Sequence, residues 1–206
     1  MGADSKGLVI LLHGVGSNGA DMAGLADAMA PALPGIAFAT PDAPLPFDGG
    51  GMGRQWFSIA GVTTQNRPAR VAAARAARDE MLAGLIAEAG FADRLDTVIL
   101  LGFSQGAIMA LDAMASGRWA LGGVVAFAGR LATPTPLAPA LKTPVLIIHG
   151  DADRVMPVAE AGDAEARLTA LGAKVEVLIE PGIGHQVGRE GLSRAVAFIR
   201  ERLLRS

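Results

Sequence analysis

One serine lies where a reactive nucleophile would be expected. The apolar run Val98–Leu101 leads directly into Gly102–Gly106, which reads Gly-Phe-Ser-Gln-Gly with Ser104 at its centre, and a helical pattern follows. A Gly-x-Ser-x-Gly turn between a strand and a helix holds its serine in strained backbone geometry with the hydroxyl exposed. The N-terminus of the helix then points at the reacting atom, where it stabilises a developing oxyanion. The motif alone arises by chance in about one chain in eight of this glycine content, so its placement carries the argument.

A serine hydroxyl attacks a carbonyl carbon only when an imidazole removes its proton and a carboxylate orients that imidazole. Of the three histidines, His185 lies late in the chain, in a glycine-rich loop after the last expected strand. Asp151 and Asp153 follow the preceding expected strand. The order serine, acid, histidine is typical of α/β-hydrolases, and a parallel sheet brings such loops to one edge. Which aspartate is the acid stays open, because either could instead bond to its own turn.

We expect the oxyanion to be stabilised by the backbone N–H groups of Val15 and Gln105. Val15 lies in the loop after the first expected strand, where Gly14 lets the backbone turn sharply, and Gln105 directly follows the serine. The side chain of Gln105 is expected to be incidental. His13 and His149 each end an apolar run beside a glycine, and we interpret both as structural residues that hydrogen-bond loop carbonyls.

The first loop also supports a rival interpretation, dinucleotide binding. Gly14, Gly16 and Gly19 match a Gly-x-Gly-x-x-Gly phosphate loop, and Asp42 follows the next strand, where a ribose-binding acid would lie. This hypothesis explains neither the serine turn nor the aspartate and histidine loops. The histidines lack metal-binding spacing, and the residues after Asp151 lack the later ligands of a calcium loop. We therefore expect no metal and no other cofactor.

The elements that must position these residues alternate strand and helix, which is typical of a parallel sheet with helices on both faces. The expected strands are Gly7–His13, Ile36–Thr40, Thr97–Leu101, Gly123–Ala128, Val145–His149 and Val175–Ile179. The expected helices are Ala20–Ala32, Ala69–Ala89, Gln105–Ser116, Val158–Leu171 and Glu190–Leu204. Four strands are continuous apolar runs, typical of buried strands, whereas the last one alternates and is expected at an edge. We predict a single domain over residues 1–206, with about six strands and no separate cap domain.

Composition limits the classes of function. With 206 residues, 51% of them hydrophobic and 18% charged, the chain can bury a full core. A net charge of −2 without a basic stripe gives no footprint for nucleic acid. The absence of cysteine excludes disulfides and thiolate chemistry. No apolar run reaches the length of a membrane span, so we expect a cytoplasmic protein without an integral membrane segment. A homodimer is left open.

On these residues the chain resembles the phospholipase/carboxylesterase family, which includes the acyl-protein thioesterases. The resemblance covers nearly the whole chain and is carried by the segments His13–Gly16, Arg54–Phe57, Gly102–Gly106, His149–Asp153, Val155–Pro157 and Gly184–His185. It implies Ser104 as nucleophile, Asp153 as acid and His185 as base in an α/β-hydrolase fold. It also implies the N–H groups of Val15 and Gln105 as the oxyanion hole.

The resemblance further implies hydrolysis of carboxylic esters of short to medium acyl chains, with thioesters and lysophospholipids as related substrates and no cofactor. Trp56, Met52 and Ile183 are candidates for lining the substrate site. Arg130, in the second long loop, is interpreted as solvated rather than substrate-binding. The alternative to an efficient esterase is a non-catalytic or slow-turnover ligand-binding protein of the same fold.

Overall fold

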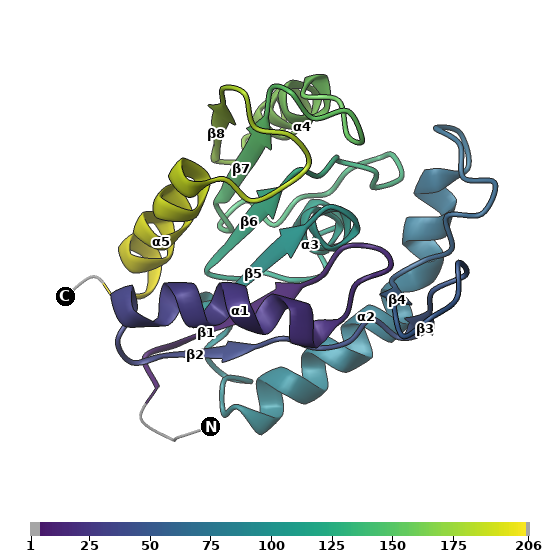
Figure 1. The fold of residues 1–206 in the computed structure, drawn as a ribbon. Helices are drawn as coiled ribbons and strands as arrows, with labels where there is room; N and C mark the ends of the chain where they lie inside the picture. The colour runs from purple at the N-terminus through teal and green to yellow at the C-terminus, as the bar shows by residue number, and fades with distance from the viewer. Residues whose placement is uncertain (1–4, 205–206) are drawn as a thin grey trace.

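The computed structural model describes residues 5–204, and its central feature is a six-stranded parallel sheet (Figure 1). The strands are β1 (Gly7–Leu12), β2 (Ile36–Ala39), β5 (Val98–Phe103), β6 (Gly123–Phe127), β7 (Val145–Gly150) and β8 (Val175–Glu180). Their order across the sheet is β2-β1-β5-β6-β7-β8. The predicted parallel sheet of about six strands is confirmed, and so is the edge position of the last strand.

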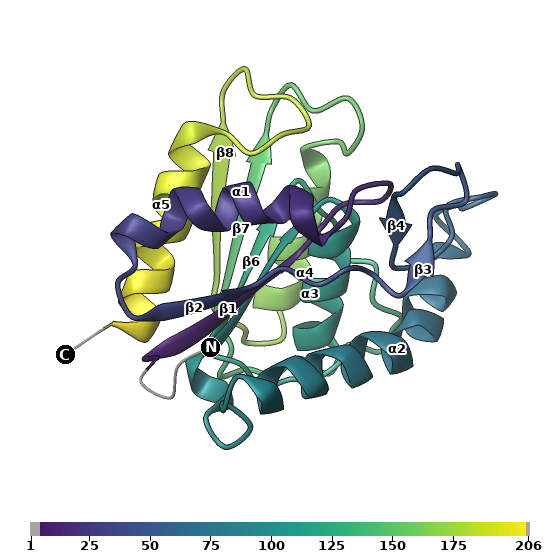
Figure 2. The ribbon, with the colours of Figure 1, turned by 60° about the horizontal axis from the view of Figure 1, so that its bottom comes forward.

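Within residues 5–204, five α-helices cover the two faces of the sheet (Figure 2). They are α1 (Gly19–Met29), α2 (Arg67–Glu88), α3 (Gln105–Ala115), α4 (Ala159–Thr169) and α5 (Arg189–Leu203). Helices α1 and α5 pack on one face, whereas α2, α3 and α4 pack on the other. Two 3-10 helices, Ala30–Ala32 and Leu95–Thr97, precede β2 and β5.

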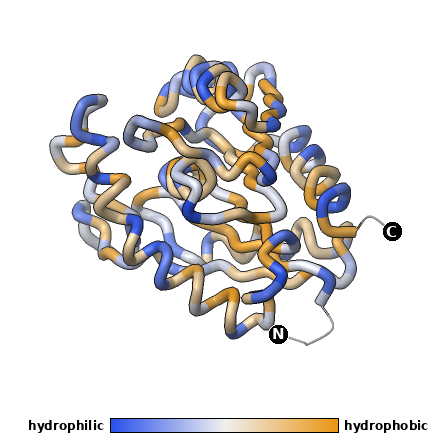
Figure 3. Tube along the Cα trace, turned by 180° about the vertical axis from the view of Figure 1, so that it is seen from behind, coloured by the Kyte–Doolittle hydropathy of each residue, from blue (hydrophilic) through white to orange (hydrophobic). Residues whose placement is uncertain are grey.

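The strands are apolar on both sides because helices cover both faces of the sheet. In β1, Leu8, Ile10 and Leu12 pack toward α2 and α3, and the alternate residues Val9 and Leu11 pack toward α1 and α5. Hydrophobic residues accordingly follow the strands and the inner sides of the helices (Figure 3). Each fully buried side chain of this size contributes roughly 1.5–3 kcal/mol, which makes the sheet a rigid base for the loops above it.

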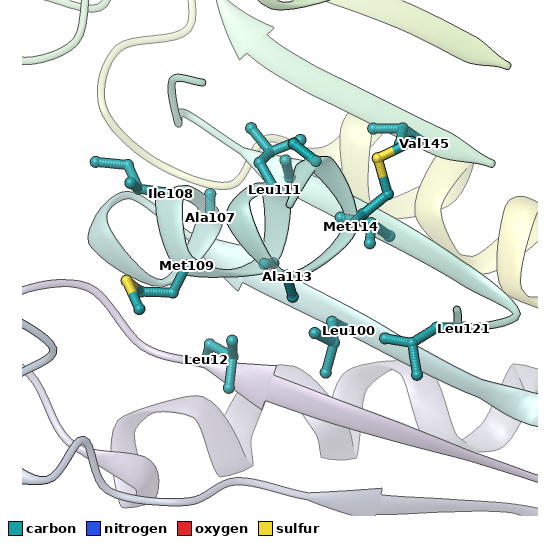
Figure 4. Packing of buried hydrophobic residues seen from close by; sticks show 14 of the residues in the cluster. Leu12, Leu100, Ala107, Ile108, Met109, Leu111, Ala113, Met114, Leu121 and Val145 are labelled. Atoms are coloured by element: carbon teal, nitrogen blue, oxygen red, sulfur yellow. The ribbon is translucent and has the colours of Figure 1, made fainter. Parts of the chain in front are cut away.

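Helix α3 is the most deeply buried helix, and every one of its residues is buried. Figure 4 shows how its apolar side chains lie against those of neighbouring strands, such as Leu12 and Leu100. A buried ion pair ties α3 to α2: Asp112 accepts hydrogen bonds from Arg75 and, at 2.8 Å, from Arg78. Since α3 begins directly after Ser104, this anchoring fixes the position of the serine turn.

The expected element boundaries differ from the observed ones by a few residues, and one pair of short strands was not expected. The helix expected over Ala20–Ala32 ends at Met29, because Pro31 in the next turn cannot continue the helical hydrogen bonds. The long loop after β2 contains an antiparallel pair of two-residue strands, β3 (Leu45–Pro46) and β4 (Arg54–Gln55). Among the helices of residues 5–204, none is long and apolar enough to cross a membrane.

Candidate active site

Ser104 occupies a strained turn between β5 and α3. Its φ of 52° and ψ of −113° lie outside the regions that L-residues usually adopt. A Cβ on Gly102 would overlap the backbone of Gly106, and a Cβ on Gly106 would overlap the carbonyl oxygen of Leu12. The turn therefore closes only with glycine on both sides of the serine. The Ser104 N–H donates to the Phe127 carbonyl at 2.9 Å, which ties the turn to β6.

A continuous chain of hydrogen bonds joins Ser104, His185 and Asp153. The Ser104 hydroxyl lies 2.9 Å from Nε2 of His185, and Nδ1 of His185 lies 2.7 Å from Oδ2 of Asp153. The three residues follow β5, β8 and β7, so the parallel topology delivers them to the same edge of the sheet. Asp153 is fully buried at its side chain and His185 is 18% exposed, so the imidazole can reach both the acid and a substrate.

The two candidate acids have different partners. Oδ1 of Asp153 accepts from the backbone N–H groups of Val155 and Met156, each at 2.8 Å. Burial acts to raise the pKa of Asp153, but the hydrogen bonds from Met156, His185 and Val155 outweigh it and hold that pKa below its usual range. Asp151 is exposed and accepts from the Gly182 N–H at 2.7 Å, which ties its turn to the loop after β8. The geometry thus brings Asp153, rather than Asp151, to the imidazole.

Two backbone N–H groups lie next to the serine and are free to bind an oxyanion. Gln105 is the first residue of α3, where the N–H has no partner within the helix. Within residues 5–204, the N–H of Val15 has no hydrogen-bond acceptor. The loop of Val15 packs against the serine, since a Cβ built on Gly14 would lie 3.4 Å from the Cβ of Ser104. Both residues that the sequence indicated therefore line the same cavity as Ser104.

The side chain of Gln105 is not incidental, and that expectation is wrong. Its Oε1 accepts from the Trp56 N–H at 2.8 Å, and its Nε2 donates to the Phe57 carbonyl at 2.7 Å. The indole Nε1–H of Trp56 in turn donates to the His13 carbonyl at 2.9 Å. One buried amide thereby holds the long loop after β2 against the start of α3, which the spacing of the motif could not reveal.

The other two histidines make the structural contacts expected of them. Nδ1 of His13 donates to the Gly14 carbonyl at 2.7 Å, and Nε2 accepts from the Ala43 N–H at 2.9 Å. Burial lowers the pKa of His13, which favours this neutral form. Nε2 of His149 bonds to the Met156 carbonyl at 2.8 Å.

The start of α1 is poorly suited to a phosphate group. The Gly19 N–H already donates to Asp42 at 2.7 Å, so the expected ribose-binding acid is a helix cap instead. Asp21 lies in the first turn of the same helix, and its N–H donates to Asn18. Two carboxylates thus stand where a phosphate would bind, and they would repel it. Within residues 5–204, His, Asp and Glu side chains form no group of three that could hold a metal ion.

A cavity of about 240 Å³ opens beside Ser104. It is lined by Val15, Phe57, Ile59, Val62, Arg67, Ser104, Gln105, Ile108, Arg130, Val155 and Met156. Three residues expected to line the substrate site are not among them. The side chain of Trp56 is only 1% exposed and packs in the core, Met52 is 90% exposed on the loop between β3 and β4, and Ile183 lies in the loop before His185. Ile108, one helical turn after Ser104, could have been found from the periodicity of α3.

The interpretation of Arg130 as a solvated residue is also wrong. Its side chain is 13% exposed and forms an ion pair with Glu160 at 3.0 Å. It lines the cavity beside Ser104 together with Arg67. The lining of the cavity is therefore mostly apolar and includes two positively charged side chains.

Comparison with known proteins places this geometry in context. The sequence matches the phospholipase/carboxylesterase family over residues 2–203. It is 33% identical over 193 residues to the esterase YpfH of Escherichia coli strain K12, covering 94% of this chain and 82% of that protein. A probable carboxylesterase of Oryza sativa subsp. japonica is 35% identical over 216 residues, covering 98% of this chain and 90% of that protein. The crystal structure of esterase PE8 is similar with a TM-score of 0.89 and 38% identity, covering 97% of this chain and 94% of that one. Together with the observed sheet, these likenesses confirm the α/β-hydrolase fold.

Proposed function

Because this chain belongs to the phospholipase/carboxylesterase family and is an enzyme of the carboxylesterase type, we propose that it cleaves esters of short to medium acyl chains through an acyl-enzyme on Ser104. Thioesters and lysophospholipids of comparable acyl size are further candidate substrates. A cavity of about 240 Å³ lies just below the usual range of volumes for ligand sites, which supports a short acyl group.

The proposed reaction proceeds in two acyl transfers. The Ser104 oxygen attacks the ester carbonyl carbon as its proton passes to Nε2 of His185, while Asp153 stabilises the imidazolium. The carbonyl oxygen becomes an oxyanion and is bound by the N–H groups of Val15 and Gln105. His185 then gives its proton to the alcohol oxygen as the ester bond breaks. Water, deprotonated by the same imidazole, attacks the acyl-enzyme, and the carboxylic acid leaves as the imidazolium returns that proton to the Ser104 oxygen.

The observation that carries the proposal is the unbroken chain of hydrogen bonds from Ser104 through His185 to Asp153, at 2.9 and 2.7 Å. A carboxylate at Nδ1 fixes the tautomer whose Nε2 can accept the serine proton. The lowered pKa of Asp153 keeps that carboxylate ionised at neutral pH. The free N–H of the half-buried Val15 adds support, because it has no acceptor within residues 5–204 and its residue lines the same cavity as Ser104.

Replacing the nucleophile tests the proposal directly. Ser104→Ala should lower kcat toward p-nitrophenyl butyrate by about 10⁴–10⁶, the range seen when triad members are removed. Ser193→Ala, on the exposed side of α5, is the matched control and should keep full activity. A loss of less than tenfold in Ser104→Ala would refute the proposed mechanism. Labelling of Ser104 by a fluorophosphonate without steady-state turnover of any ester would instead support the slow-turnover binding protein.

A pair of isosteric substitutions tests the choice of acid. Asp153→Asn should lower kcat by about 10⁴, because an amide stabilises the wrong tautomer of His185. Asp151→Asn keeps an oxygen that can accept from the Gly182 N–H, so its kcat should stay within about tenfold of the parent enzyme. Equal losses in the two variants, with circular dichroism unchanged, would contradict the assignment of Asp153.

A further inference from the structure

Two adjoining cavities share a wall that carries two arginines. The cavity beside Ser104 and a second cavity of about 480 Å³ both have Arg67 and Arg130 among their lining residues. Arg67 is the first residue of α2, and Arg130 lies three residues after the end of β6. A substrate bound in the cavity beside Ser104 therefore lies within reach of both guanidinium groups.

The charges around this wall are paired except for one. Arg130 forms an ion pair with Glu160 at 3.0 Å, and Arg167, on the second cavity, pairs with Asp163 at 3.1 Å. Among residues 5–204, the guanidinium of the half-buried Arg67 has neither an ion pair nor a hydrogen bond. The wall thus holds one uncompensated positive charge.

The surroundings of Arg67 make that charge unfavourable without a counter-ion. Burial lowers the pKa of Arg67 and the neighbouring positive charge of Arg130 lowers it further, whereas the carboxylate of Glu160 offsets only part of this effect. The hydroxyl of Thr133, on the second cavity, is buried and has no hydrogen-bond partner within the described part of the chain. A bound anion would compensate the charge of Arg67, and the guanidinium fork matches a carboxylate in particular.

The position of His185 decides which part of the substrate occupies the cavity. The leaving alcohol must lie at Nε2 of His185, because that atom returns the proton to it. His185 is not among the residues that line the cavity, whereas Val15 and Gln105 are. This lining favours the acyl chain, rather than the leaving alcohol, as the group that the cavity receives.

We propose that this enzyme hydrolyses half-esters of short dicarboxylic acids, whose free carboxylate at the far end of the acyl chain binds Arg67. The inference rests on the proposed function, because it needs an acyl group held on Ser104. The apolar residues Phe57, Ile59 and Ile108 contact the methylene chain between the two ends. Ion pairing at Arg67 then holds the ester carbonyl in place relative to the serine, so the gain appears in kcat/KM.

The test compares two substrates of equal acyl length, mono-p-nitrophenyl adipate and p-nitrophenyl hexanoate. The first carries a carboxylate where the second carries a methyl group, and enzyme-free hydrolysis is subtracted from both rates. In the parent enzyme, kcat/KM for the adipate ester should exceed that for the hexanoate ester. Arg67→Gln should lower the adipate-to-hexanoate ratio by about 10- to 100-fold, the range for a lost charge-assisted hydrogen bond. Arg67→Lys retains the charge and should keep a ratio between those of the parent and Arg67→Gln.

Controls separate a local effect from a general change of charge. Lys142→Gln removes a positive charge from the opposite edge of the sheet, just before β7, and should leave the ratio unchanged. A parent enzyme that prefers the hexanoate ester, or an Arg67→Gln variant with an unchanged ratio, overturns the inference while the proposed esterase function stands. Absence of Ser104-dependent turnover of both esters overturns the function and the inference together.

Discussion

The amide of Gln105 provides a sharp test of how this active site is built. Gln105→Met keeps the length and nearly the shape of the side chain but removes both hydrogen bonds to the loop after β2. The Trp56 N–H and the Phe57 carbonyl would then be buried without partners, because these residues are only 1% and 5% exposed. Each orphaned group costs about 1–3 kcal/mol. Methionine, unlike glutamine, has no amide group that must leave water on folding, and this difference offsets part of the cost. We therefore expect the free energy of unfolding to fall by about 2–4 kcal/mol.

Two measurements on the same variant distinguish a local effect from a global one. Urea unfolding, followed by the fluorescence of Trp56 and Trp119, gives the change in the free energy of unfolding. Steady-state kinetics with p-nitrophenyl butyrate should show KM raised several-fold and kcat lowered less. The reason is that Phe57 lines the acyl cavity, whereas the oxyanion donor is the backbone of residue 105.

A matched substitution and a clear negative outcome complete the test. Gln65→Met alters an exposed glutamine in the same loop and should leave both stability and KM unchanged within error. If Gln105→Met unfolds within about 0.5 kcal/mol of the parent enzyme and retains its KM, the amide does not hold the loop in place. The reasoning from buried hydrogen bonds would then be refuted.

Two further predictions concern stability. The pKa of His13 is lowered in the folded state, so the unfolded chain binds more protons below pH 6.5. The free energy of unfolding should therefore fall as pH drops from 6.5, and His13→Gln, which can still accept from the Ala43 N–H, should show a smaller slope in urea unfolding at pH 7 and pH 5. Equal slopes in the parent enzyme and in His13→Gln would contradict the assignment of this pH dependence to His13. Asp112→Asn leaves the buried Arg78 with a weakened counter-charge and should lower stability by about 3 kcal/mol, whereas the exposed Asp27→Asn should change it by less than 0.5 kcal/mol. A small effect at both positions would show that the ion pair is dispensable.

The sheet could be predicted from the sequence because each part of it depends on a local pattern. Strands buried on both faces are continuous apolar runs, and β1, β5, β6 and β7 were recognisable on that basis. The parallel topology then brings the loops that follow these strands to one edge of the sheet. Chemically active residues in those loops therefore meet there. The meeting of Ser104, Asp153 and His185 follows from this rule without any knowledge of their side-chain contacts.

The contacts that the sequence could not reveal join segments that are far apart along the chain. Gln105 bonds to Trp56 across 49 residues, and Arg78 pairs with Asp112 across 34. A single polar residue in an apolar segment produces no periodic pattern. The sequence therefore does not show whether its side chain is buried against a partner or solvated. The same reason explains why Arg130 was expected in solvent. Met52 lies in a loop, where no periodic pattern shows whether an apolar side chain is buried, and it is exposed.

The strained serine turn depends on the surrounding core, and this dependence links the fold to the chemistry. A backbone such as that of Ser104 costs of order 1–3 kcal/mol and persists only where its surroundings over-determine it. Here β5 and α3 are buried on either side of the turn, and the Asp112 ion pair holds α3 to α2. The nucleophile is thus fixed by the core, whereas the acyl cavity is built partly from the long loop after β2. Changes in that loop can therefore alter which esters bind without disturbing the positions of Ser104, His185 and Asp153.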